Sequence, residues 1–107
     1  MNQLESMAER VRTFCAERDW DQFHGPKDLA IGLVTEASEL LEIFRFQSET
    51  ESQAMFANES KRTAIEDELA DVLFFVLRFS QMHKIPSKNL AVTTVNTISF
   101  NSLRTGS

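Results

Sequence analysis

Four carboxylates occur as two pairs that can act together on a metal ion. Glu36 and Glu39 lie in one segment of helical periodicity, and Glu68 and Asp71 lie in another. The i, i+3 spacing places both acids of a pair on one helix face, where like charges repel unless something offsets them. If the two helices pack antiparallel, the pairs face each other. Such a cluster of hard oxygen ligands suits Mg²⁺.

The surroundings of these acids strengthen the prediction of a metal site. On a helical wheel, Glu36 lies near Leu29 and Ile43, at the edge of the apolar arc, and the second pair is flanked by apolar residues of its own helix. Carboxylates in such places are costly to bury unpaired. Acidic pairs are also common on solvated helix faces, so a plain surface role remains the alternative.

The other ligand types in the chain argue against iron and zinc. Di-iron helical bundles use Glu-x-x-His pairs, whereas the two histidines here, His24 and His83, do not lie three residues after a glutamate. The single cysteine, Cys15, and the scarcity of histidine disfavour zinc. Mg²⁺ with a phosphorylated substrate fits best, because a divalent cation bridges an acidic site and a triphosphate.

Helices must position these acids, and the sequence predicts an all-α fold. Glycine (3) and proline (2) are scarce, which favours long helices over many short strands. Apolar periodicity predicts helices over 3–18 and 28–46, a third from about 60–63 to His83, and a fourth in the tail from Ser87, with Gly25-Pro26 as a turn. The third helix is apolar nearly all round and is expected to be central and buried.

The segment between the second and third helices is predicted to be a connection, with a short turn near residues 55–56. Thr63 and Glu66 have capping-box spacing at the start of the third helix, although Asn58 and Ser60 are rival caps.

Length and charge bound the class of protein. The 107 residues suit a single domain over 1–107, and a domain this short gains from self-association. A net charge of −5 without a basic run argues against a nucleic-acid polymer as partner. We find no signal peptide and no apolar run of transmembrane length, so we expect no membrane partner and a cytoplasmic protein.

These motifs resemble the MazG-like all-α nucleoside triphosphate pyrophosphohydrolases, and within them the dCTP pyrophosphatases. Thr35-Glu36-Ala37-Ser38-Glu39-Leu40 and Glu68-Leu69-Ala70-Asp71-Val72-Leu73 are similar to the two acidic motifs of that family. The segment from Arg18 to Leu29, with its tryptophan and histidine, is similar to the loop that precedes the first acidic helix. The resemblance covers about residues 4–85.

The resemblance implies a four-helix, MazG-like bundle completed by dimerisation or tetramerisation. It implies hydrolysis of nucleoside triphosphates between the α- and β-phosphates, with Mg²⁺ as cofactor and a role in cleaning the nucleotide pool. Mg²⁺ and catalysis are assigned to Glu36, Glu39, Glu68 and Asp71, the phosphates to Lys27, and the base to Trp20, His24, Phe46 and Phe75. Among the carboxylates, Glu39 is the preferred base for the attacking water.

The chain departs from the family at three places. Phe46 stands where the dCTP pyrophosphatases have a second tryptophan, and Phe75 stands where the family often has tyrosine. In the tail, Thr94 and Ile98 replace a lysine and an asparagine of the family, so the tail over 87–107 is divergent. Three hypotheses follow: a pyrophosphohydrolase, a metal-dependent nucleotide-binding module with little or no turnover, and a purely structural helical oligomer.

Overall fold

The chain is helical throughout the part that the structure describes. The computed structural model describes residues 2–105, and side chains over residues 2–99. This part contains five α-helices and two short 3₁₀ turns and no strand. By their contacts the described residues form two compact units, one from those within the segments 1–24 and 77–107 and the other from 25–76. No described helix combines the length and the hydropathy that crossing a bilayer requires.

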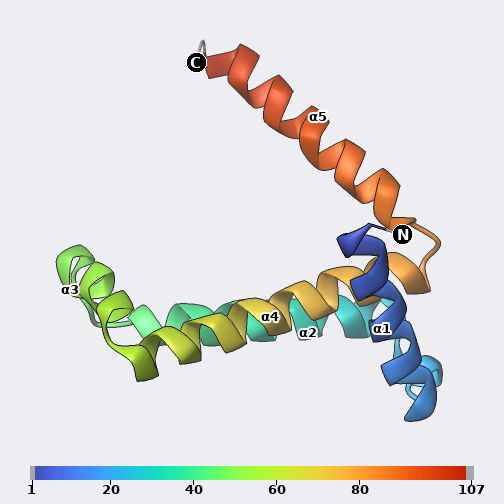
Figure 1. Ribbon diagram of the computed structural model, residues 1–107, viewed down its shortest axis with the longest axis horizontal. Helices are drawn as coiled ribbons and strands as arrows, with labels where there is room; N and C mark the ends of the chain where they lie inside the picture. The colour runs from blue at the N-terminus through green and yellow to red at the C-terminus, as the bar shows by residue number, and fades with distance from the viewer. Residues whose placement is uncertain (1, 106–107) are drawn as a thin grey trace. The chain divides into compact units, whose positions relative to one another are not determined.

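The unit formed by residues 25–76 is built on two antiparallel helices (Figure 1). Helix α2 spans Pro26–Phe44, with Pro26 in the first turn, where its missing N–H costs nothing. Helix α4 spans Glu59–Met82, and its part up to Val76 belongs to this unit. Between them lie α3 (Glu49–Ala54) and the 3₁₀ turn η2 (Met55–Ala57).

The second unit combines the N-terminal helix with the C-terminal part of the chain. Helix α1 spans Gln3–Glu17 and is capped by Asn2, whose side-chain oxygen accepts from the Glu5 N–H at 2.8 Å. The 3₁₀ turn η1 (Asp21–Phe23) follows it. Helix α5 spans Ser87–Thr105 and contacts α1. The buried residues of this unit include Ala8, Cys15 and Leu77.

The prediction of an all-α fold is confirmed, and the four predicted helices are present with shifts of a few residues at their ends. Gly25-Pro26 begins α2 instead of forming a separate turn. The predicted connection contains a helix, α3, because Ser48 and Glu51 form a capping box there. The predicted Thr63–Glu66 box is wrong: α4 begins at Glu59, and Asn58 caps it through the Lys61 N–H at 3.0 Å.

The expected burial of the third helix is only partly correct within this chain. Ile65 and Leu77 of α4 are buried, whereas Leu69 and Leu73 are 52% and 38% exposed. Leu69 and Leu73 lie on the same broad side of the helix as the buried residues, so part of the apolar surface of α4 stays uncovered within its own chain.

Helices α2 and α4 approach closely at a glycine. A Cβ atom built on Gly32 would lie 2.3 Å from the nearest ring carbon of Phe75, far inside van der Waals contact. The absent side chain therefore makes room for the Phe75 ring, one helical turn before Glu36 on the same helix. This contact helps to bring the acidic segments of α2 and α4 together.

We expect Gly32→Ala to lower the free energy of unfolding by about 1–2 kcal/mol. Overpacking typically costs about 1–3 kcal/mol, and the higher helix propensity of alanine, worth about 1 kcal/mol, offsets only part of this. In a Phe75→Ala background the clash is gone, so the same change should become stabilising. Urea unfolding of the two single variants and the double variant measures both effects.

Gly25→Ala is the matched control, because nothing lies within 4 Å of a Cβ atom built there. It should cost less than about 1 kcal/mol in either background, as expected for an N-cap glycine. If Gly32→Ala stabilised the protein with Phe75 in place, the close approach would not constrain the helix pair.

Candidate functional site

Three glutamates from two helices form a compact cluster in the unit of residues 25–76. Carboxylate oxygens of Glu36 and Glu39 from α2 and Glu68 from α4 lie within 4.8 Å of one another. Their positions follow from the antiparallel pairing: the i, i+3 pair of α2 faces α4 at the level of Glu68. The cluster offers only oxygen ligands, the set that hard cations such as Mg²⁺ prefer.

Two oxygens of this cluster have lost water without gaining a hydrogen-bond donor. Oε2 of Glu36 and Oε2 of Glu68 are buried and accept no hydrogen bond. They lie within reach of neighbouring carboxylates, but two ionised carboxylates cannot bond each other without a shared proton. Because an unpaired buried charge is expensive, a proton or a cation must neutralise part of the cluster.

The acid–base behaviour of the cluster follows from this geometry. Loss of water raises the pKa of Glu36 to about 7, and the side chain and charge of Glu39 and the charge of Asp71 add to the effect. Burial, followed by the charge of Glu39, also raises the pKa of Glu68. The site therefore holds protons near neutral pH that a divalent cation would displace.

Asp71 stands slightly apart from the other three acids. It is exposed and lies outside the group that shares the 4.8 Å limit. Its charge nevertheless acts on Glu36 and Glu68, since it raises the pKa of each. The structure thus brings together three of the four predicted carboxylates and leaves the fourth close enough to interact electrostatically.

Two residues predicted to bind the base lie together in the other unit. The ring centroids of Trp20 and His24 are 6.1 Å apart. Those of Phe14 and Trp20 are 5.4 Å apart, with the two rings inclined at 72° in an edge-to-face contact. The Trp20 side chain remains 37% exposed, so part of its indole is accessible for stacking. The Arg18 guanidinium lies 3.5 Å from the centre of the Phe14 ring. This cation–π contact helps to fix the Phe14 ring that packs against Trp20.

The remaining predicted residues belong to the unit of residues 25–76. Phe46 is 87% exposed and has a φ of 67°, an unfavourable conformation for a bulky residue. Asp19 and Lys84 share this conformation, and each of the three residues stands two positions after the end of a helix, where a left-handed residue commonly terminates it. Phe75 is partly buried against Gly32, and Lys27 is exposed in the first turn of α2.

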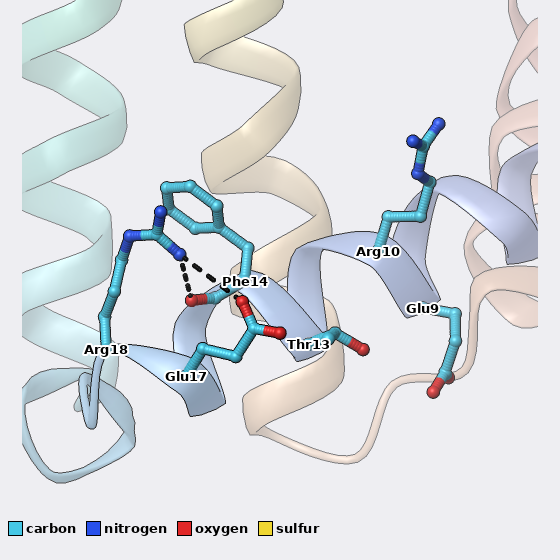
Figure 2. A pocket seen from close by; sticks show the side chains of 6 residues that line it. All are labelled: Glu9, Arg10, Thr13, Phe14, Glu17 and Arg18. Carbon is cyan, nitrogen blue, oxygen red and sulfur yellow. Dashed lines mark hydrogen bonds and ion pairs between the residues drawn. The ribbon is translucent and has the colours of Figure 1, made fainter.

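A separate hollow of about 300 Å³ lies on the surface of α1 (Figure 2). Its lining comes from α1 and its C-cap, where Arg18 donates to the Phe14 carbonyl oxygen at 2.9 Å and lies 3.9 Å from Glu17. Its lining acids, Glu9 and Glu17, are exposed, and neither joins a group of metal-ligand geometry. The acidic cluster, with two buried unpaired oxygens, is the stronger candidate.

One residue of interest went unnoticed in the sequence. Arg78 is 1% exposed in α4 and contacts the segment that carries Trp20 and His24. The available signal was a single arginine inside the apolar run that ends at Phe79, because such a charge is rarely buried without partners.

Comparison with known proteins gives consistent matches. No protein-family model matches the chain. The mouse protein named dCTP pyrophosphatase 1 is 33% identical over 94 residues, which cover 88% of this chain and 55% of that protein. The human protein of the same name is 38% identical over 74 residues, covering 69% and 44%. The chain thus spans about half the length of the curated relatives that it matches.

A solved structure shares the fold over nearly the whole chain. The crystal structure of a pyrophosphatase from Archaeoglobus fulgidus matches with a TM-score of 0.85 and 27% sequence identity. The match covers 97% of this chain and 93% of that one.

The raised pKa values predict how pH and Mg²⁺ change stability. A carboxyl with a higher pKa in the folded state stabilises that state while protonated; this contribution is complete below its ordinary pKa of 4.5 and is lost as pH rises through about 7. The melting temperature of the metal-free wild type should therefore fall between about pH 5 and pH 8, compared with that of the Glu36→Gln variant at the same pH. Added Mg²⁺ should restore it, more at pH 8 than at pH 5.5.

Glu42→Gln is the control for this experiment, because Glu42 lies on the same helix but pairs with Arg45 at 3.3 Å. It should keep the wild-type dependence on pH and Mg²⁺. Melting curves of the wild type that coincide with those of Glu36→Gln at every pH, with and without Mg²⁺, would contradict the interpretation of the cluster.

Proposed function

Because the chain belongs to the MazG-like family of all-α nucleoside triphosphate pyrophosphohydrolases, in the branch of the dCTP pyrophosphatases, we propose that it hydrolyses nucleoside triphosphates to the monophosphate and pyrophosphate. The observation that carries the proposal is the cluster of Glu36, Glu39 and Glu68, with two buried carboxylate oxygens that accept no hydrogen bond. A cluster of this kind favours a divalent cation over the protons that otherwise neutralise it, and a cation bridges an acidic protein to a triphosphate.

Mg²⁺ is the proposed cofactor, held by Glu36, Glu39 and Glu68 with help from Asp71. The donor set fits, because it consists of carboxylate oxygens, two of which are unpaired and buried. Bound Mg²⁺ supplies electrostatic stabilisation of the phosphoryl oxygens and offsets the negative charge of the substrate.

The chain's own carboxylates divide into two roles in this proposal. Glu36 and Glu68 each direct one buried oxygen into the cluster and are the more enclosed members. Glu39 is exposed, so its carboxylate can also meet a solvent water. We therefore assign to Glu39 the orientation and deprotonation of the water that attacks the α-phosphorus.

The remaining assignments concern the phosphates and the base of the nucleotide. Lys27 provides a point charge for the phosphates from the first turn of α2. The exposed indole of Trp20 stacks on the base, with His24 beside it, and the exposed ring of Phe46 and the partly buried Phe75 contribute further aromatic contacts. Since the mammalian relatives are named for dCTP, this nucleotide is the first substrate to test. Removal of unwanted nucleotides from a cytoplasmic pool is the proposed role.

Self-association is part of the proposal. In the unit of residues 25–76, apolar side chains lie exposed on both long helices. They are Ile31, Val34 and Leu41 on α2 and Leu69 and Leu73 on α4. A surface of this kind is usually covered by a partner, and a symmetric homo-oligomer of two or four chains is the simplest solution.

A second candidate function is nucleotide binding with little or no turnover. Helix α5 is kept, but it presents Thr94 and Ile98 where the family has a lysine and an asparagine. Thr94 donates its hydroxyl to the Leu90 carbonyl oxygen at 2.8 Å, and Ile98 is 63% exposed and apolar. Neither residue can replace the positive charge of a lysine at a phosphate.

The proposal predicts Mg²⁺-dependent release of pyrophosphate from one or more dNTPs, abolished by EDTA. Glu39→Gln should lower kcat by about 10²–10⁴-fold, the usual range for loss of a general base. Asp71→Asn should lower activity by about 10–100-fold, as expected for a group that supports the metal from its periphery. A panel of dNTPs with a pyrophosphate assay measures these effects and the base preference together.

Glu42→Gln and Asp67→Asn are the matched controls, since each makes the same chemical change on the same helix outside the cluster. Both should keep activity within about threefold of the wild type. Nucleotide binding that depends on Mg²⁺ without pyrophosphate release would favour the second candidate. Hydrolysis that persists in EDTA would contradict both.

A further inference from the structure

Arg78 is a charged side chain in an almost fully buried position. It is 1% exposed, in the part of α4 that belongs to the same unit as α1 and η1. A guanidinium cannot lose its proton in a protein, so burial is tolerable only if its N–H groups find partners. The partners of Arg78 are therefore informative about what it does.

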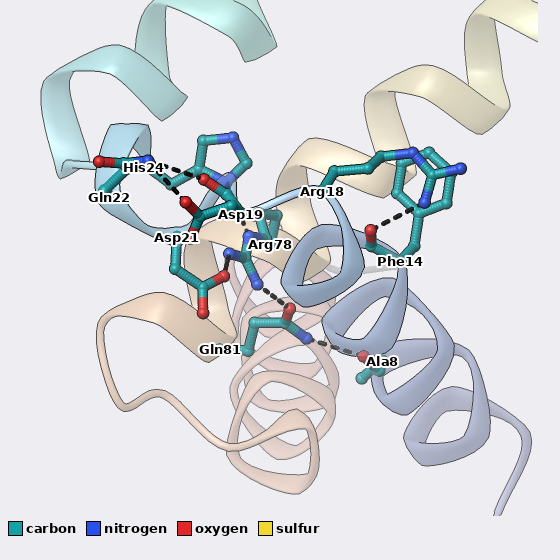
Figure 3. A network of polar contacts seen from close by, with 9 residues as sticks. All are labelled: Ala8, Phe14, Arg18, Asp19, Asp21, Gln22, His24, Arg78 and Gln81. Carbon is teal, nitrogen blue, oxygen red and sulfur yellow. Dashed lines mark hydrogen bonds and ion pairs between the residues drawn. The ribbon is translucent and has the colours of Figure 1, made fainter.

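All three nitrogens of Arg78 donate hydrogen bonds (Figure 3). Nε donates to Nδ1 of His24 at 2.8 Å, Nη1 donates to Oε1 of Gln81 at 2.7 Å, and Nη2 donates to Oδ1 of Asp21 in an ion pair. Gln81 in turn donates from Nε2 to the Ala8 carbonyl oxygen of α1 at 2.8 Å. One guanidinium thus connects α4, α1 and the segment around η1.

The bond to His24 fixes the position of the imidazole proton. Arginine is a donor only, so Nδ1 of His24 must accept and carries no proton. The single proton of the neutral ring then lies on Nε2, which becomes a hydrogen-bond donor. Within this unit, the Arg78 guanidinium faces the ring at Nδ1, and the same guanidinium is paired with the carboxylate of Asp21.

The same contacts hold the backbone that carries Trp20. Arg78 bonds to Asp21, the first residue of η1, and to His24, which follows it. Gln22 donates to the backbone and side-chain oxygens of Asp19 at 3.2 and 3.1 Å. Asp19 has a φ of 56°, a conformation that needs such support. The segment that carries Trp20 and His24 is therefore held by two contacts with the buried Arg78 guanidinium, one at Asp21 and one at His24.

We propose that Arg78 is a positioning residue for nucleoside recognition: it locks His24 in its Nε2–H form as a donor to an acceptor atom of the nucleoside, and it fixes the segment that presents Trp20. This inference rests on the proposed function only in assigning Trp20 and His24 to the nucleoside. The Asp21 side chain is 59% exposed, so water can solvate its carboxylate without Arg78. The stability of Asp21 therefore does not explain why a guanidinium is buried beside it.

The first experiment is nitrogen NMR of ¹⁵N-histidine protein without nucleotide, at a pH near 8. The chain has two histidines, and the spectrum of His24→Ala assigns them. In the wild type, Nδ1 of His24 should show the shift of an unprotonated acceptor and Nε2 that of an N–H. In Arg78→Met the two nitrogens should move towards averaged values as both tautomers become populated. A protonated Nδ1 in the wild type, or an unchanged spectrum in the variant, would overturn the proposal.

The second experiment separates binding from chemistry. With the nucleotide that is hydrolysed best, Arg78→Met should raise KM about tenfold, the value of one lost hydrogen bond, and leave kcat within about threefold. In a His24→Ala background the same substitution should raise KM by a smaller factor than in the wild type, because the part of the effect that passes through His24 is already lost and only the part through the Trp20 segment remains. Independent, multiplying effects of the two substitutions would show that Arg78 does not act through the imidazole.

Arg12→Met is the matched control, since Arg12 is an exposed arginine of the same unit that pairs with the exposed Glu9 at 3.7 Å. It should change neither the spectrum nor KM. If Arg78→Met does not fold, Arg78→Lys replaces it, because lysine keeps the charge but lacks the planar guanidinium with its several donors. This variant should raise KM by less than tenfold. A wild-type KM and spectrum in this variant would contradict the role of the guanidinium. If the wild type hydrolyses no nucleotide, the proposed function fails, while the spectra still decide the role of Arg78.

Discussion

The constraint on which the rest depends is the repulsion among carboxylates that face each other across α2 and α4. Glu36, Glu39 and Glu68 converge although their charges repel, and two oxygens, one of Glu36 and one of Glu68, are buried without a donor. The antiparallel pairing of α2 and α4 brings these side chains together at an electrostatic cost. This arrangement becomes favourable only when protons or a cation supply the missing positive charge, so the metal-free fold carries a cost that ligand binding relieves.

The surrounding structure can be understood as the means of holding that cluster together. Gly32 allows the Phe75 ring to lie directly against α2, which brings the helices close near Glu36. At the far end of the pair, the capping box of Ser48 and Glu51 starts α3 and so shapes the return to α4. In the other unit, Arg78 plays the comparable part for Trp20 and His24, with hydrogen bonds to charged and neutral acceptors instead of a close helix contact.

The sequence was sufficient for the helices and for the pairing of the acids, because both depend on periodicity within one segment. The i, i+3 spacing of Glu36 and Glu39 specifies a shared face whatever the rest of the chain does. It was not sufficient for α3, whose cap Ser48 was not recognised. Nor did it fix the start of α4, where the rival caps Asn58, Ser60 and Thr63 differ only in the hydrogen bonds that the backbone finally makes. The network of Arg78 joins residues more than fifty positions apart, and no local pattern encodes such partners.

The most direct test of the central claim is calorimetric titration of the protein with Mg²⁺ at pH 7 in two buffers that differ in ionisation enthalpy. If the cation replaces protons shared by the buried carboxylates, binding should release protons at pH 7, and the release should shrink at about pH 9, where the groups are already ionised. The observed heats should then differ between the buffers at pH 7 and converge at the higher pH. Mg²⁺ binding with equal heats in both buffers at pH 7, or no binding to the folded protein, would contradict the account.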